Sequence, residues 1–310
     1  MSLLDAIRAL SDLAPPRELP PADLAELADV LEAHGLAALA SYHLETRPIG
    51  AGLPAQFREK LLTLYQGVVN DNVFKVMTLR PVLREAEVPV VVLGGLAAVD
   101  WLYPHLAFRP LGDLRLAVRG EDGARFAAAA ARHAFRPAGT SEGGRVATFG
   151  DGRIAFTLQE GLWPGAEADP ALFSAAVPLP AFGPTVSRPC ADDMLLSTVA
   201  EQALLGLQAP LLSFVDLREL LRLPAGEGPA PERVAPRARA LGLARALHGS
   251  MALLAGFFPV VSAAAAALSP ELSAPERVAV DAVVEAARDP ARLVRLRGAE
   301  AAARLVVAPR

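Results

Sequence analysis

The chain has 310 residues, 53% of them hydrophobic, and a formal net charge of −4. That length allows one large domain or several smaller ones, and that much apolar sequence argues against intrinsic disorder. Because it has no long basic run, the composition also argues against a protein that binds nucleic acid.

The single cysteine, Cys190, excludes an internal disulfide framework and makes a cysteine-based zinc site unsupported. The first residues, MSLLDAIRAL, lack the basic start and long apolar run of a secretory signal peptide. We therefore expect a cytoplasmic protein. Residues 251–268 carry no charge, but Gly256 and Pro259 interrupt them. We expect a buried helix, a turn and a second helix there, and no membrane span.

Apolar residues at helical spacing fill the first part of the chain. We expect helices over residues 22–34, 36–44 and 55–86. Pro81 lies inside the third range, where the missing N–H of proline should kink or split the helix. Residues 1–86 are therefore predicted to be an N-terminal helical segment.

The pattern changes over residues 87–180, which we predict to be an α/β core. The expected order is strand, helix, strand, helix and two strands. The stretches concerned are VPVVVLGG, LAAVDWLY before Pro104, LRLAV, EDGARFAAAAARHAF, RVATFG and RIAFTLQ. The GDG between the last two is typical of a hairpin turn.

A proline-rich connector, 178–189, leads into residues 181–310, predicted to be a C-terminal helical domain. The expected helices are 191–207, 210–222, 231–255, 260–268 and 275–305. The predicted class is therefore α+β, mostly helical overall, with a small mixed sheet.

One stretch points to chemistry, VVLGGLAAVDWLYPHLAFRPLGDLRLAV at 91–118. Gly94 and Gly95 end a buried strand, and glycines let backbone amides approach phosphate oxygens closely. Asp113 lies beside the next apolar run. Phosphate-transfer sites often carry Asp-x-Asp at such a place, because alternate residues of a strand share one face. The third residue is Arg115.

The chain resembles the nucleotidyltransferase superfamily that includes DNA polymerase beta, and more closely the bacterial uncharacterised nucleotidyltransferase family. The resemblance covers about residues 60–260. The stretches that carry it are VVVLGG, LYP, FRPLGDLRLAV, SFVDLRELL (213–221) and LGLARALHGSMALLAGFFP (241–259). It implies a nucleotidyltransferase-like core flanked by helical segments, and attack on the α-phosphate of a nucleoside triphosphate with two divalent cations.

The sequence departs from the family where those cations would be held. Asp113 keeps the first carboxylate, but Arg115 replaces the second with a guanidinium, which has donors only and repels a cation. On RIAFTLQ the matching positions are Ala155 in place of the third acid and Thr157 in place of a histidine. If that match slips, Glu160 or Asp151 could supply an acid, but neither repairs Arg115.

Three hypotheses follow. The first is a catalytically inactive nucleotidyltransferase-like protein that acts as a binding, regulatory or assembly component with a protein partner. The second is an active Mg²⁺-dependent nucleotidyltransferase that moves a nucleoside monophosphate from a triphosphate to a protein or small molecule. The third is a helical scaffold that binds no nucleotide.

We favour the first hypothesis, with no metal ligands and no cofactor; Mg²⁺ and a nucleoside triphosphate belong to the second alone. The residues expected to contact a nucleotide or phosphate are Gly94, Gly95, Arg109 and Arg115. Asp113 is catalytic only if the protein is an active enzyme. Otherwise we expect it to pair with Arg115, Arg109 or another local arginine, or to cap a turn.

Overall fold

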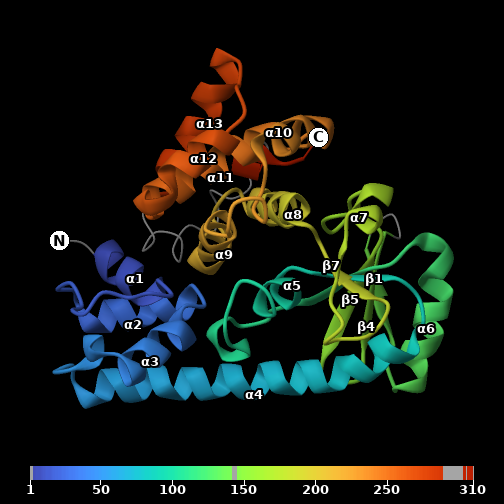
Figure 1. Cartoon of the computed structure of the whole chain (residues 1–310), viewed down its shortest axis with the longest axis horizontal. Coiled ribbons are helices and arrows are strands. Elements are labelled where there is room, and N and C mark those ends of the chain that lie inside the picture. Colours follow the sequence, from blue (N-terminus) through green and yellow to red (C-terminus); the bar gives the residue numbers. More distant parts are fainter. Residues whose placement is uncertain (1–2, 142–144, 289–302, 305, 310) are drawn as a thin grey trace. The chain divides into compact units, whose positions relative to one another are not determined.

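A computed structural model of the chain describes residues 3–141, 145–288, 303–304 and 306–309 (Figure 1). Contacts divide the chain into two compact units. The helical unit lies within Met1–Val69, Ala107–Arg109 and Thr198–Arg310, and the α/β unit is Asn70–Leu106 with Pro110–Ser197. The division of the sequence into segments 1–86, 87–180 and 181–310 stays a prediction.

The α/β unit is built on a seven-stranded mixed sheet with the order β3-β4-β5-β2-β1-β7-β6. The strands are β1 Val90–Leu93, β2 Leu114–Ala117, β3 Arg136–Thr140, β4 Val146–Gly150, β5 Ala155–Gln159, β6 Val177–Pro178 and β7 Val186–Arg188. Helices follow or separate them: α5 Gly95–Val99, η3 Gly120–Asp122, α6 Gly123–Arg132 and α7 Pro170–Ser174. Helix α8, Ala191–Leu204, begins in this unit and ends in the helical unit. The predicted α+β class is confirmed.

The predicted strands β1, β2, β4 and β5 are all present, and β4 and β5 form the expected antiparallel hairpin. Strand β3 was not expected, because RPAGT carries the proline and glycine of a loop and all its residues are exposed. The prediction of a plain connector at 178–189 was wrong. Within it, β7 pairs with β1 and extends the sheet.

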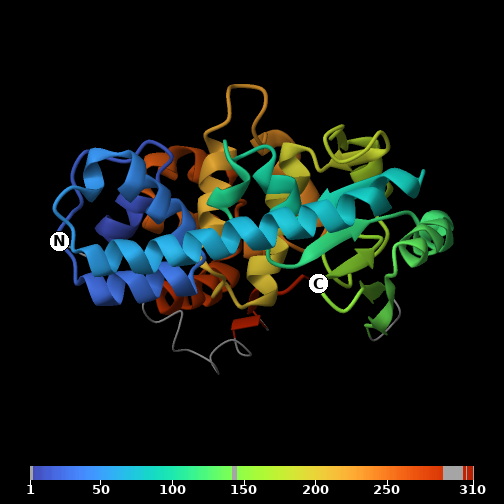
Figure 2. The ribbon, with the colours of Figure 1, turned by 90° about the horizontal axis from the view of Figure 1, so that it is seen from below.

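The α/β core is centred on Phe156 of β5, which is 1% exposed. Its ring contacts three others: Phe126 at 5.8 Å, Phe135 at 5.0 Å and Phe149 at 5.4 Å between centroids. Phe126 belongs to α6, so this cluster joins α6 to the sheet, and Figure 2 shows that helix beside the strands. Aromatic burial of this kind fixes which face of β5 points inward.

Helix α4, Ala55–Glu85, is one continuous helix that includes Pro81 (Figure 2). Pro81 was expected to kink or split this helix, and the split is absent. The proline is exposed and lies in the last turns, where only one backbone hydrogen bond is lost. Buried Leu79, Val82 and Leu83 surround it in the sequence and hold those turns in place.

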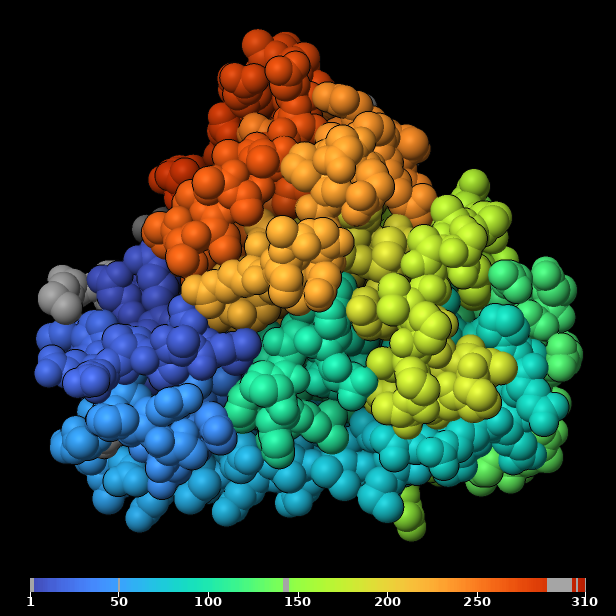
Figure 3. All heavy atoms as spheres, viewed as in Figure 1, coloured from blue at the N-terminus to red at the C-terminus, as the bar shows by residue number. Residues whose placement is uncertain are grey.

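The helical unit joins segments from both ends of the chain. Its elements are α1 Leu3–Ser11, α2 Leu24–Ala33, α3 Ala37–Thr46, η1 Pro48–Gly50, α9 Leu211–Leu221, α10 Pro231–Ala240, α11 Ala244–Phe257, η4 Pro259–Val261, α12 Ser262–Leu268 and α13 Ala274–Ala287. Arg8 donates to the carbonyls of Phe257 and Gly256. In Figure 3 the dark blue atoms of α1 accordingly adjoin the orange atoms of the C-terminal third.

The single helix expected over 231–255 is two helices, because Gly242 takes φ 70° between α10 and α11. Residues 251–268 form the end of α11, η4 and α12, as predicted. In the described part of the chain, no helix is long and apolar enough to cross a membrane. The last predicted helix begins as α13, whereas 289–302 lie outside the described residues.

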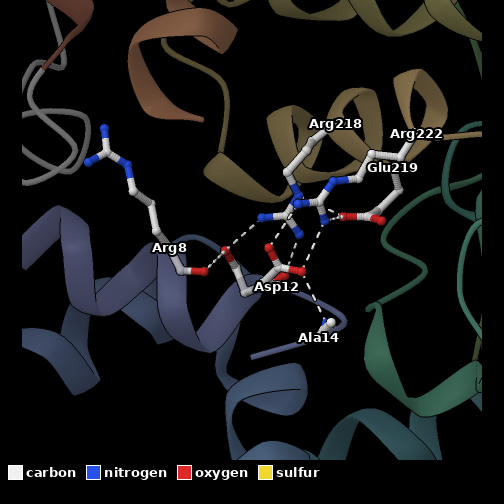
Figure 4. Close-up of polar contacts among 7 residues, drawn as sticks. Arg8, Asp12, Ala14, Arg218, Glu219 and Arg222 are labelled. Carbon is white, nitrogen blue, oxygen red and sulfur yellow. Dashed lines mark hydrogen bonds and ion pairs between the residues drawn. The ribbon is translucent and has the colours of Figure 1, made fainter. Parts of the chain in front are cut away.

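A buried polar network ties α1 to α9 (Figure 4). Arg218, 1% exposed in its side chain, donates to the Ser11 hydroxyl and carbonyl and pairs with Glu219 at 2.6 Å. Arg222 binds Asp12 at 2.9 Å. Burial raises the pKa of Asp12, but the hydrogen bonds from Arg222 and from the N–H of Ala14, together with the charges of Arg218 and Arg222, outweigh it and the net pKa is lowered. Nearly buried charges are tolerated here because each has a partner.

His43 gives the helical unit a pH dependence. It is 1% exposed on α3, and burial lowers its pKa to about 4, with a smaller contribution from the charge of Arg47. In the unfolded chain a histidine protonates near 6.5, so acid favours the unfolded state between that pH and about 4. We expect the free energy of unfolding to fall by about 2 kcal/mol from pH 6.5 to pH 5. Urea unfolding at each pH measures this fall. His43→Leu should remove most of it, and the exposed-site variant His105→Asn should not.

Candidate functional site

The candidate site is built on the turn between β1 and α5. Gly94 has φ 57° and ψ −131°, a backbone conformation that a residue with a side chain rarely adopts. Its carbonyl accepts the first hydrogen bond of α5, from the N–H of Ala98 at 3.1 Å. Glycine is therefore required at this position by the turn itself.

Arg115 projects from β2 onto this turn. Its Cα is level with Leu93 of β1 on one side and with Thr157 of β5 on the other. The residue is 9% exposed. A Cβ built on Gly94 would lie 2.1 Å from Nη2 of Arg115. The guanidinium therefore rests directly on the backbone at Gly94, in space that only the missing side chain leaves open.

Asp113 lies just before β2 and is exposed. Within the described residues, its carboxylate makes no hydrogen bond or ion pair, so the predicted pairing with an arginine is not present. It lies two residues before Arg115. Leu114 is level with Phe156 in the parallel β2–β5 pair, so Asp113 and Ala155 precede that level on neighbouring strands.

Strand β5 places no acidic residue beside Asp113 or Arg115. Ala155 begins the strand, and Thr157 stands opposite Arg115 with its hydroxyl buried and, as far as the described residues go, without a hydrogen-bond partner. Asp151 accepts from the N–H groups of Arg153 and Ile154, both at 2.8 Å, and these bonds lower its pKa. Glu160 follows the far end of β5, against Gly120. Asp151 therefore caps its own turn and Glu160 lies against Gly120, so both alternative acids are engaged elsewhere than at Arg115.

Arg109, the other arginine predicted to contact phosphate, belongs to the helical unit. Its Nε and Nη2 donate to both carboxylate oxygens of Asp216, at 2.7 to 3.1 Å. The side chains are 12% and 3% exposed. Asp216 lies in α9, within the SFVDLRELL stretch. The sequence shows Arg109 and Asp216 in two separate stretches that resemble the family. It does not show that their side chains form an ion pair.

The residues present do not fit a pair of magnesium ions. Mg²⁺ needs converging oxygen ligands in a tight octahedron. The four positions hold Asp113, Arg115, Ala155 and Thr157. Among the described residues, no group of three or more His, Cys, Asp or Glu side chains is arranged to hold a metal ion.

A family model described as "Uncharacterised nucleotidyltransferase" matches residues 20–259, well over half of the chain. The chain belongs to the uncharacterised nucleotidyltransferase family. Searches of curated proteins and of solved structures found no match. The matched range contains the Gly94 turn, the β2 motif and Asp216. The family assignment therefore covers the Gly94 turn, the β2 motif and the SFVDLRELL stretch.

Proposed function

We propose that this member of the uncharacterised nucleotidyltransferase family does not transfer nucleotides, and that it acts as a binding, regulatory or assembly component. The observation that carries the proposal is the guanidinium of Arg115, which lies on the Gly94 backbone where the family pattern calls for a carboxylate. Any phosphate at this site would meet Arg115 and the backbone of Gly94 and Gly95 without a bridging metal.

Electrostatics supports inactivity more strongly than the loss of a ligand alone. A divalent cation about 4 Å from a guanidinium is repelled by about 8 kcal/mol at an effective dielectric constant of about 20. Asp113 offers a single carboxylate against this repulsion, and it is exposed. A neutral residue at 115 would leave a weak metal site, whereas arginine opposes one.

An exposed apolar group on α4 supports a protein partner. Val73, Phe74 and Met77 are 41%, 40% and 70% exposed and fall within one helical turn. The proposal includes a cytoplasmic setting, because the one cysteine, Cys190, is free, as is usual in a reducing compartment.

The decisive test is nucleotide chemistry. With α-³²P-labelled nucleoside triphosphates and Mg²⁺ or Mn²⁺, we expect no label on any protein or small-molecule acceptor. Calorimetry should show weak ATP binding or none, equal with Mg²⁺ and with EDTA. Tight Mg²⁺-dependent ATP binding would overturn the proposal, and label transfer that Asp113→Ala abolishes would establish an active enzyme instead.

A restored variant supplies the positive control for that assay. Arg115→Asp with Ala155→Asp adds two carboxylates beside Asp113, and we expect it to gain Mn²⁺ binding measurable by calorimetry. Arg239→Asp with Ala240→Asp makes the same charge change at exposed positions of α10 and should gain none. If the folded restored variant binds no Mn²⁺, substitution of the ligands alone does not explain the loss of the metal site.

A further inference from the structure

A cavity in the α/β unit lies at the end of α5 opposite to Gly95. Its volume is about 240 Å³, and its lining comes from the second half of α4, the end of α5, residues 103–106 and Phe182. All of these residues belong to one unit. The walls combine apolar side chains, Val76, Val99 and Phe182, with the charged groups of Arg80 and Asp100.

Arg80 is the lining residue whose hydrogen-bonding capacity the described residues do not fill. It is half-buried on α4, and its Nε is buried with no hydrogen-bond partner among the described residues. Its guanidinium carbon lies 5.6 Å from the centroid of the Phe182 ring. In the described part of the chain, no carboxylate forms an ion pair with it. A guanidinium carries five donors in a planar fork that fits a carboxylate or phosphate.

Charged groups of both signs lie around this cavity. Arg188 stacks on Trp101, with its guanidinium carbon 3.6 Å from the ring centroid. Asp100 is the one acid among the lining residues. Burial raises the pKa of Asp100, and the charges of Arg80 and Arg188 act against that rise. Among the described residues no ion pair joins Asp100 to Arg80, so the guanidinium of Arg80 can take a further anion.

We propose that this cavity binds a small organic oxyanion, a carboxylate or a phosphate ester, through the guanidinium of Arg80. The apolar walls would hold the carbon part of the molecule, and the cation–π contact with Phe182 helps to position the guanidinium. Such a site does not depend on whether the nucleotidyltransferase core is active. It is separate from the residues predicted to contact a nucleotide, Gly94, Gly95, Arg109 and Arg115.

The test is calorimetric titration with two series of probes, acetate to hexanoate and methyl to butyl phosphate, with inorganic phosphate beside them. We expect saturable binding that strengthens by up to about fourfold for each methylene group buried. Arg80→Met should weaken it by about tenfold or more, since a charge-assisted hydrogen bond is lost. Arg84→Met, an exposed arginine one turn further along α4, is the matched control and should bind as the parent does.

Two further variants separate binding from a purely structural role. Asp100→Asn removes the opposing negative charge and should tighten the binding of every probe. Arg80→Lys keeps the charge without the planar fork and should bind between the parent and Arg80→Met. Without any anion, Arg80→Met should melt at or above the temperature of the parent, because an unpartnered donor is removed.

The proposal is overturned if no probe binds saturably at millimolar concentration, or if Arg80→Met binds as tightly as the parent. It is also overturned if Arg80→Met melts lower than the parent while Arg80→Lys binds every probe like the parent. A readout independent of heat is the fluorescence of Trp101 in a Trp163→Phe background, which should change with butyl phosphate in the Arg84→Met protein and not in Arg80→Met.

Discussion

Gly94→Ala should lower the free energy of unfolding by about 2–4 kcal/mol. An alanine at φ 57°, ψ −131° is strained wherever it occurs. The added Cβ would also stand 2.1 Å from Nη2 of Arg115, so the guanidinium must leave the turn. Urea unfolding followed by circular dichroism measures the loss.

A double-mutant cycle separates these two causes. In an Arg115→Ala background the clash is gone and the strain remains, so we expect Gly94→Ala to cost about 1 kcal/mol less there. Gly139→Ala is the matched control, because nothing lies within 4 Å of a Cβ at that strand position. Equal costs in both backgrounds would contradict the contact between the guanidinium and Gly94 on which the proposed inactivity depends.

Arg109→Met should destabilise the protein by about 3–5 kcal/mol, because it leaves the carboxylate of Asp216 buried without its cation. The bidentate pair is 12% and 3% exposed, so water cannot replace the arginine at both oxygens. Arg109→Lys should lose less, since a charge remains but the planar fork does not. Chemical unfolding of each variant gives the comparison.

Removing both partners tests whether the loss is electrostatic. Arg109→Met with Asp216→Leu replaces the pair by apolar groups and should recover much of the stability. Arg125→Met removes an arginine that is 62% exposed and 3.5 Å from Asp122, and should change stability by less than about 1 kcal/mol. If Arg109→Met left stability unchanged and altered only phosphate binding, the residue would be a ligand contact, as the sequence motif predicts.

Local patterns predicted most of the elements well. The alternation in LRLAV, the GDG turn and the buried run VVVL each specify a strand through nearest-neighbour chemistry. Strand β7 and the division between α10 and α11 could not be predicted with the same means. The first depends on pairing with β1, nearly a hundred residues earlier in the chain, and the second on a positive φ at Gly242.

The sequence by itself determined the family-like order of turn, acid and arginine, because residue identities carry the chemistry: Arg115 cannot ligate a cation in any fold. Only the tertiary structure decided where the charges go. The strand register brings the guanidinium of Arg115 onto Gly94. The packing of the helical unit brings Arg109 into an ion pair with Asp216. The tertiary structure also leaves the buried Nε of Arg80, beside a cavity, with no hydrogen-bond partner in the described chain. Such contacts join residues far apart in the chain, so no local pattern encodes them.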